Sequence, residues 1–361
     1  MSKQTSERSA VELPSSVTYR NFPRTRYQGS KYKLLPWLAD SFQALTFDTA
    51  LDVFGGTAAV SYLLKTLGKT VYYNDALAFN AQVGTALIEN ASVTLDEDDV
   101  AFIFTQDPNR TYRSFIEETF SDIYFTDEEN HWLDIVVQNI HTMECPYKRA
   151  MAFWALFQSA ISKRPYNLFH RKNLYVRTSN VKRSFGNKAT WDRPFDVHFR
   201  KFVREANNAV FDNGRDNKVF CLKDEDLQVR ADLVYMDPPY IPEKGALTRY
   251  RDFYHFLEGI CFYHEWKEHL DRDSKHLKLQ SESSNWECKE GIHDAFDMLF
   301  EKFEEAIMVV SYRKDGIPSI DWIVERLEKR GKQVEVKEVD YKYVLSKKGN
   351  LKEVLIVAAQ K

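Results

Sequence analysis

The chain has 361 residues, of which 43% are hydrophobic, 14% aromatic and 29% charged, with a formal net charge of −3; this composition is typical of one large globular domain with an insertion, or of two domains. Its four widely spaced cysteines form no Cys-x-x-Cys pair, which argues against a metal site or a disulfide framework and favours the reducing cytoplasm. No apolar run is long enough to span a membrane, and residues 1–18 are expected to be a disordered polar tail rather than a signal peptide.

The first predicted element is a turn at residues 26–31 (Arg-Tyr-Gln-Gly-Ser-Lys), followed by a helix with hydrophobic residues from Leu34 to Phe42. Free backbone amides at the amino end of a helix suit a carboxylate or a similar anion. A plain helix cap is the alternative interpretation of this turn.

Residues 49–75 follow the order strand, glycine turn, helix, strand and acid. This is the order of a nucleotide-binding βαβ unit, in which Gly55 and Gly56 would let the backbone approach a ligand and Asp75 would accept the ribose hydroxyls. Asp52, just before the glycines, would repel a pyrophosphate but attract an amine. The pattern therefore favours S-adenosylmethionine over a dinucleotide, with a purely structural βαβ unit as the alternative.

Residues 77–161 are predicted to be mainly helical, with their Trp, Phe and Leu side chains in the core. The next segment, residues 163–204, contains twelve Lys or Arg and only two acids. We expect hairpins or extended loops here that grip DNA phosphates and enter a groove; a solvated basic surface is the alternative. The candidate DNA-binding residues are Arg164, Arg171, Lys172, Arg177, Lys182, Arg183, Lys188 and Arg193.

The most informative stretch is Asp237-Pro238-Pro239-Tyr240, which follows the buried strand predicted at residues 233–236. In open α/β sheets the carboxyl ends of strands are where ligands bind. The Asp237 carboxylate and the Pro238 carbonyl can accept hydrogens from the amine of a flat base while Tyr240 stacks on its ring. An ordinary loop and a proline-rich ligand segment are the alternatives.

The rest of the chain continues the alternation of strands and helices. A loop at residues 249–251 could close over a bound base, and residues 334–339 and 354–358 are expected to be antiparallel edge strands. The sequence thus predicts a doubly wound, Rossmann-like α/β fold. The α/β domain would comprise residues 19–110 and 212–361, interrupted by a helical and basic insertion at residues 111–211.

With these elements placed, the chain resembles the alpha group of N6-adenine DNA methyltransferases, the Dam-like enzymes, from about Arg26 onward. The resemblance rests on the order Tyr-x-Gly-Ser-Lys, glycine turn, basic insertion and Asp-Pro-Pro-Tyr. It implies transfer of a methyl group from S-adenosylmethionine to N6 of an adenine flipped out of double-stranded DNA. It also implies a cytosolic monomer of a bacterium or phage, with a cognate restriction endonuclease as a functional partner.

The resemblance further implies roles for individual residues. Asp52 would lie near the methionine part of the cofactor, Asp75 on its ribose and Asp224 near its adenine. In the family's Phe-x-Gly-x-Gly pattern the second glycine is replaced here by Ala58. The implied cofactor-binding residues are Tyr27, Gly29, Lys31, Asp52, Phe54, Gly55, Gly56, Thr57, Asp75 and Asp224, and the implied catalytic residues are Asp237, Pro238, Pro239 and Tyr240.

Three other functions remain open at this point. Cytosine-N4 methylation uses the same geometry, commonly with Ser in place of Asp237, and methylation of RNA or of a protein glutamine more often uses Asn there. A DNA-binding relative without activity is the third. The absence of a Pro-Cys motif argues against methylation at cytosine carbon 5.

Overall fold

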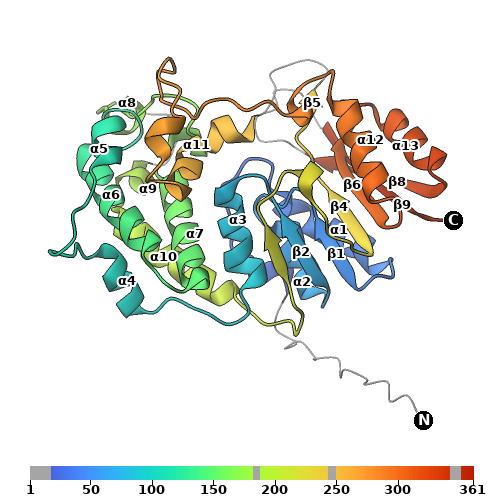
Figure 1. The fold of residues 1–361 in the computed structure, drawn as a ribbon, viewed down its shortest axis with the longest axis horizontal. Coiled ribbons are helices and arrows are strands. Elements are labelled where there is room, and N and C mark those ends of the chain that lie inside the picture. The colour runs from blue at the N-terminus through green and yellow to red at the C-terminus, as the bar shows by residue number, and fades with distance from the viewer. Residues whose placement is uncertain (1–17, 182–187, 243–248, 342–350) are drawn as a thin grey trace, which may run out of the picture.

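The computed structural model describes residues 18–181, 188–242, 249–341 and 351–361. A seven-stranded sheet with the order β3-β2-β1-β4-β6-β9-β8 occupies one side of the molecule (Figure 1). Its first five strands are parallel, whereas β9 is antiparallel to both β6 and β8. The strands are β1 (Thr49–Asp52), β2 (Thr70–Asn74), β3 (Lys218–Phe220), β4 (Leu233–Met236), β6 (Ile307–Arg313), β8 (Lys332–Tyr341) and β9 (Leu351–Gln360).

The strand order reverses at β1. The chain proceeds from β1 outward to β2 and β3, and then returns to place β4 on the other side of β1. Asp52 ends β1 beside Tyr235 of β4, so Asp52 and Asp237 leave neighbouring strands at the same edge. In doubly wound sheets this reversal point opens a crevice at the carboxyl ends of the strands, where ligands bind.

Helices cover both faces of the sheet because successive strand residues point to opposite sides. Ala50 and Tyr235 belong to the core beneath α1 (Leu35–Gln43) and α2 (Ala59–Thr66). Leu51 and Val234 belong to a second core with α12 (Ile292–Lys302) and α13 (Ile320–Lys329). A two-stranded sheet of β5 (Ile241–Pro242) and β7 (Gly316–Ile317) lies beyond the end of β4.

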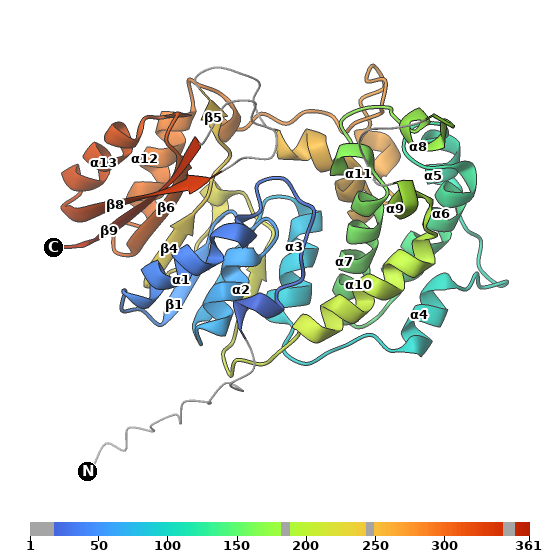
Figure 2. The same ribbon diagram turned by 180° about the vertical axis from the view of Figure 1, so that it is seen from behind.

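The other side of the molecule is helical. Figure 2 shows α10 running from the sheet side to this helical side. None of the described helices has the length and hydrophobicity needed to cross a membrane. The helices outside the sheet layers are α3 (Ala78–Gly84), α4 (Glu97–Phe104), α5 (Phe115–Thr119), α6 (Asp127–His141), α7 (Pro146–Ser162), α8 (Tyr175–Thr178), α9 (Lys188–Asp192), α10 (Phe195–Ala209) and α11 (Tyr250–Cys261).

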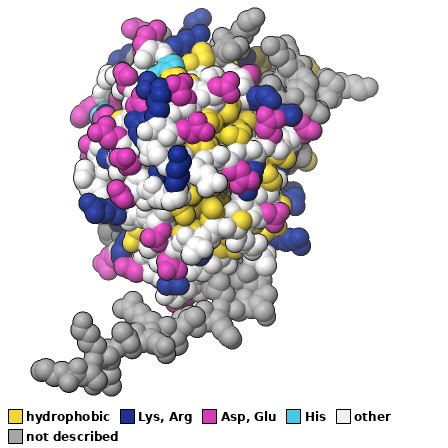
Figure 3. Space-filling view, turned by 90° about the vertical axis from the view of Figure 1, so that its right-hand side faces the viewer, with side chains coloured by type: hydrophobic (Ala, Val, Ile, Leu, Met, Phe, Trp, Pro, Cys, Tyr) yellow, Lys and Arg dark blue, Asp and Glu magenta, His cyan; other side chains and the backbone are white. Residues whose placement is uncertain are grey.

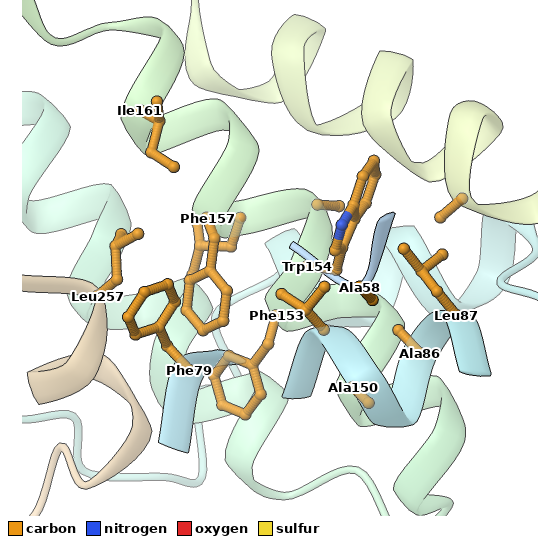
Figure 4. Packing of buried hydrophobic residues seen from close by; sticks show 14 of the residues in the cluster. Ala58, Phe79, Ala86, Leu87, Ala150, Phe153, Trp154, Phe157, Ile161 and Leu257 are labelled. Carbon is orange, nitrogen blue, oxygen red and sulfur yellow. The ribbon is translucent and has the colours of Figure 1, made fainter. Parts of the chain in front are cut away.

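Helix α7 joins the two sides through one continuous core. Its side chains Phe153 and Phe157 stack on each other, and Phe157 meets Phe79 of α3 edge to face (Figure 4). Leu257 of α11 belongs to the same cluster. The helices of the predicted insertion are therefore anchored to the element that follows β2, which fixes their position relative to the carboxyl edge of the sheet.

Two expectations about local structure were wrong in part. Hairpins or extended loops were expected over residues 163–194; the described part forms no hairpin, and the chain there contains loops and the short helices α8 and α9. The β-forming residues at 174–177 yield to tertiary contacts, because Leu174 and Arg177 are buried and Arg177 binds Glu129. Of the two strands expected at the sheet edge, only β8 lies there, since β9 is inserted between β6 and β8.

Candidate functional site

A pocket of about 490 Å³ lies at the carboxyl ends of β1 and β4, within the range of about 300–1,000 Å³ that is usual for small-molecule sites. It collects segments that are far apart in the sequence. Ser30 Oγ lies 3.3 Å from Thr57 Oγ1, so the two predicted turns touch. The predicted residues that line it are Tyr27, Gly29, Lys31, Asp52, Phe54, Gly55, Gly56, Thr57, Asp75, Asp224, Asp237 and Pro239.

The backbone of both turns requires small residues. Gly29 has a φ of +87°, and a Cβ there would lie 2.4 Å from the Tyr250 hydroxyl. Gly56 has a φ of +49°, and its amide donates to Asp75 Oδ2 at 2.9 Å. Ala58, which replaces the family glycine, also has a left-handed φ of 63°, at a cost of about 1 kcal/mol. The backbone therefore keeps a glycine-like shape at residue 58.

Asp52 lines the pocket with a carboxylate that is almost fully buried. The residue is 1% exposed, and Ser61 Oγ donates to its Oδ2 at 2.7 Å. Its Oδ1 is buried without a hydrogen-bond partner among the described residues. Burial, together with the nearby Asp237 and Asp75 carboxylates, raises the pKa of Asp52 to about 7. A buried orphan acceptor of this kind fits a cationic donor such as an ammonium group.

Asp75 and Asp224 lie along the same pocket. Asp75 accepts hydrogen bonds from the amides of Gly56 and Leu77, both at 2.9 Å. Asp224 Oδ2 accepts from the Trp286 indole nitrogen at 3.0 Å. Burial is the main cause that raises the pKa of each acid.

Trp286 is a pocket residue that the sequence analysis missed. Its ring meets Phe54 edge to face, with centroids 5.0 Å apart, and it lines the pocket next to Asp224. Trp286 thus forms an aromatic wall of the pocket beside Asp224. The family pattern suggested an aromatic residue directly after this acid, but Glu225 holds that position here. No local signal marks Trp286, because it lies in a short 3-10 helix (Asn285–Glu287) far along the chain from Asp224.

Lys31 connects the Asp-Pro-Pro-Tyr segment to a second acid. Its Nζ lies 2.8 Å from Asp237 Oδ1 and 3.0 Å from Glu353 Oε1, and it also contacts the Tyr240 hydroxyl. That hydroxyl lies 2.7 Å from Asp237 Oδ1 and 3.0 Å from Glu353 Oε1. Glu353, on β9, is fully buried and was not among the predicted site residues.

The electrostatics of this cluster follow from one cation shared by two acids. Burial alone would lower the pKa of Lys31, but the Asp237 and Glu353 carboxylates raise it above its ordinary value. Burial raises the pKa of Asp237, Lys31 opposes this, and Glu353 raises it further. Two donors thus engage Oδ1 of Asp237, while none of the described residues donates to its Oδ2 at the pocket.

The remaining residues of the Asp-Pro-Pro-Tyr segment are placed differently. Pro238 is buried, and neither Pro238 nor Tyr240 lines the pocket. The Tyr240 ring packs edge to face on Tyr312, with centroids 5.3 Å apart. The observed contacts give Tyr240 a role through its hydroxyl, and stacking on a target base stays a prediction.

The segment expected to be a closing loop forms the amino end of α11 at the pocket mouth. Tyr27 is stacked between Tyr250 and Tyr254, at centroid distances of 5.6 and 4.4 Å. On the rim, Arg251 pairs with Glu282 at 2.7 Å. These contacts join the turn at residues 26–31 to α11.

Two predicted DNA contacts, Arg164 and Arg177, lie in the core instead of on the surface. Arg164 is 1% exposed and donates to the carbonyl oxygens of Tyr124 at 2.9 Å and Leu168 at 3.3 Å. Burial lowers the pKa of Arg164 to about 9. Arg177 pairs with both oxygens of Glu129 at 2.8 and 2.7 Å. Their guanidinium groups hold the segment together, so they are not available to a phosphate in this conformation.

The other described members of the predicted DNA-binding set are exposed. Lys172 pairs with Asp122 at 3.0 Å and Lys188 with Asp192 at 3.0 Å, both at the surface, and Arg171 and Arg193 are exposed as well. Lys182 and Arg183 lie outside the described residues. Four of the eight predicted side chains are thus seen at the surface, where solution ions or DNA can reach them.

The end of the molecule near α13 and β8 has a different surface. There, acidic and basic side chains are interspersed around a strip of hydrophobic ones (Figure 3). Charges of mixed sign do not build the field that attracts a polyanion. This face is therefore a poor match for DNA compared with residues 163–204.

Known proteins show what this chain is similar to. The family model for D12 class N6 adenine-specific DNA methyltransferases matches residues 27–315. The chain is 28% identical over 340 residues to the type II methyltransferase M2.HphI of Haemophilus parahaemolyticus, covering 91% of this chain and 94% of that protein. It is 23% identical over 321 residues to the type II methyltransferase M.NlaIII of Neisseria lactamica, covering 85% and 88% of the two chains.

Proposed function

The chain belongs to the D12 class N6 adenine-specific DNA methyltransferases, and we propose that it takes its methyl group from S-adenosylmethionine and gives it to an adenine flipped into the pocket beside Asp237. The observation that carries this proposal is the pair of free carboxylate oxygens in one pocket. Among the described residues, Asp52 Oδ1 is a buried atom without a hydrogen-bond partner, and the two side chains that bind Asp237, Lys31 and Tyr240, both contact its Oδ1 and leave Oδ2 to a ligand. Asp52 Oδ1 would accept from the amine of the cofactor, and Asp237 Oδ2 would accept from the amine of the base.

The residues between Asp52 and Asp224 fit the cofactor from end to end. Asp52 would hold the ammonium group, and Asp75, fixed by two backbone amides, would accept from the ribose hydroxyls. Phe54 and Trp286 would enclose the adenine, whose amine would donate to Asp224. When bound, S-adenosylmethionine supplies a methyl group on a positively charged sulfur.

Asp237 would act on the amine of the target adenine. Its Oδ2 would accept an N6 hydrogen, which draws the nitrogen lone pair out of conjugation with the ring. Lys31 and Tyr240 hold Oδ1 in place, so the carboxylate is positioned before the base arrives. Positioning and electrostatics of this kind suffice for direct displacement without a covalent enzyme intermediate. The proton that N6 loses would pass to Asp237.

DNA would lie across the edge that carries the pocket. Figure 1 shows α8, α11 and β5 along one edge of the molecule, and the exposed Arg171, Lys172 and Arg193 belong to the segment around α8 and α9. We assign residues 111–211 to target recognition and residues 19–110 and 212–361 to catalysis. Flipping the adenine costs a few kcal/mol, about the size of the contacts such a segment can supply.

The relatives also suggest a biological setting. Both M2.HphI and M.NlaIII are named as type II methyltransferases, and we infer that this chain acts as a monomer alongside a cognate restriction endonuclease. A restriction digest of methylated and unmethylated host DNA would test that setting. Resistance should appear only in cells that express the active methyltransferase.

The direct test is transfer of a labelled methyl group from S-adenosylmethionine to unmethylated DNA, followed by nucleoside analysis. We expect N6-methyladenine as the product. Asp237→Ala should abolish transfer while DNA binding persists, and Asp294→Ala, at an exposed position on α12, serves as the matched control. Normal transfer by Asp237→Ala would show that the assigned mechanism is wrong.

A further inference from the structure

Glu353 occupies a position where a buried strand would ordinarily carry a hydrophobic residue. It lies on β9 opposite Arg313 of β6, is fully buried, and is followed along the strand by the buried Val354 and Leu355. It also lies beyond residues 27–315, the part of the chain that the family model matches. An acid in this position calls for an explanation from its contacts.

Those contacts lead directly to the reactive end of the pocket. Glu353 Oε1 accepts a hydrogen bond from Ser311 Oγ at 2.8 Å and lies 3.0 Å from Lys31 Nζ. It lies at the same distance, 3.0 Å, from the Tyr240 hydroxyl. Lys31 and Tyr240 are the two groups that bind Asp237 Oδ1. Glu353 therefore contacts both side chains that hold the proposed catalytic carboxylate in place.

We propose that Glu353 is a positioning residue for methyl transfer, which holds Lys31 and Tyr240 so that Oδ1 of Asp237 is fully engaged and Oδ2 is presented to the target amine. This inference rests on the proposed role of Asp237. It assigns the last strand of the sheet, through one side chain, to the active site.

Energetics argue for a functional rather than a stabilising role. A buried ion pair gains little over well-packed hydrophobic residues of the same volume, because the cost of removing the charges from water offsets their attraction. The cluster here is less favourable still, since Lys31 is shared between Asp237 and Glu353. Retaining a second acid at this depth is expected where the site needs its charge and geometry.

The second acid changes the charge that the target amine meets. Lys31 and Asp237 alone would form a neutral ion pair. The positive charge of Lys31 would then offset the negative charge that Asp237 presents to the target amine. Glu353 adds a second carboxylate charge to the pair of Lys31 and Asp237. That charge lies beside a nitrogen that becomes positive as it gains the methyl group, so it stabilises the transition state more than the ground state.

The first test is Glu353→Gln, which keeps the size of the side chain and removes its charge. We expect kcat to fall about 10- to 100-fold, the range for misplacing a reacting group. The KM for DNA and the Kd for S-adenosylmethionine should change much less than kcat, because Glu353 does not itself line the pocket and reaches the cofactor side only through Lys31. Glu338→Gln is the matched control, since this acid lies on the adjacent strand β8 and pairs at the surface with Lys314 and Lys352.

The second test separates positioning from general support of the fold. Lys31→Met leaves the Asp237 and Glu353 carboxylates side by side without their cation. Adding Glu353→Gln removes that repulsion, so the double variant should have a higher kcat and a higher melting temperature than Lys31→Met alone. Simple addition of the two losses would overturn the proposal.

Other outcomes are equally decisive. Wild-type kcat in Glu353→Gln would overturn the positioning role. Equal losses of kcat and of cofactor affinity in that variant would also overturn it, because they would mark a structural residue. If Asp237→Asn kept full activity, the proposed mechanism would fail first, and this result is distinguishable because it does not involve Glu353.

Discussion

Replacing Asp52 with asparagine should weaken the binding of S-adenosylmethionine by about 30- to 150-fold. The estimate takes about 2–3 kcal/mol for a hydrogen bond to a charged group, with 1.4 kcal/mol for each factor of ten. The asparagine carbonyl can keep the 2.7 Å hydrogen bond from Ser61. Its amide NH₂ would then face the pocket and meet the ammonium group donor to donor.

The pH dependence of binding gives the same prediction a sharper form. Because burial raises the pKa of Asp52 to about 7, the free protein holds a proton there at lower pH, and only the ionised form pairs with an ammonium. Affinity should therefore fall by up to about tenfold for each pH unit below 7. In Asp52→Asn this dependence should be lost.

Isothermal titration calorimetry with S-adenosylmethionine, at about pH 6 and about pH 8, measures both effects on either side of the Asp52 pKa of about 7. Asp40→Asn, at an exposed position on α1, controls for loss of an acid as such. Wild-type affinity in Asp52→Asn would refute the assignment of the ammonium to this carboxylate. An unchanged pH dependence in that variant would show that another group is responsible.

Three further changes test the assignments outside the cofactor end. Arg164→Met should lower the free energy of unfolding by about 3 kcal/mol in urea denaturation, because it removes the donor to the buried Leu168 carbonyl and one of the two donors to the buried Tyr124 carbonyl; unchanged stability would place Arg164 at the surface after all. Arg171→Ala and Lys172→Ala should leave the melting temperature unchanged and each reduce the salt dependence of DNA binding by about one unit of log–log slope; a salt slope equal to wild type would exclude them from the DNA face. Burial raises the pKa of Glu258 from 4.5 to about 7, so the folded protein binds a proton that the unfolded chain releases, and stability should fall as pH rises through this window. Thermal melts of Glu258→Gln should show a shallower fall, and an equally steep one would contradict the assignment.

The parts of the site that the sequence predicted are those fixed by local geometry. Asp52, Gly56 and Asp75 follow or join strands of one βαβ unit, and parallel strands bring their carboxyl ends to one edge whatever the rest of the chain does. The same rule places Asp237 at that edge, because β4 pairs with β1. All ten cofactor-binding residues that the family resemblance implied line the pocket.

The site residues that the sequence did not predict are brought to the pocket by contacts between segments far apart in the chain. Glu353 reaches Lys31 only because β9 is inserted antiparallel beside β6, and nothing in the residues around Glu353 specifies that position. Trp286 meets Asp224 across a loop for the same reason. The prediction that Arg164 and Arg177 bind DNA was wrong for another reason. A count of charges along the sequence does not distinguish a surface arginine from one that binds buried carbonyl groups.

The charge of the pocket links binding to turnover. Asp52, Asp75 and Asp237 line it with Lys31, and burial raises the pKa of all three acids. Burial is unfavourable for these carboxylates in the absence of a counter-ion, so a ligand that brings an ammonium group and a positively charged sulfur gains affinity by satisfying them. In the proposed mechanism, transfer of the methyl group would remove the charge on sulfur and move it to the amine next to Asp237, which would then take up the proton. The same carboxylates that favour the donor would thus hold the spent cofactor less tightly, and this difference would favour release after each transfer.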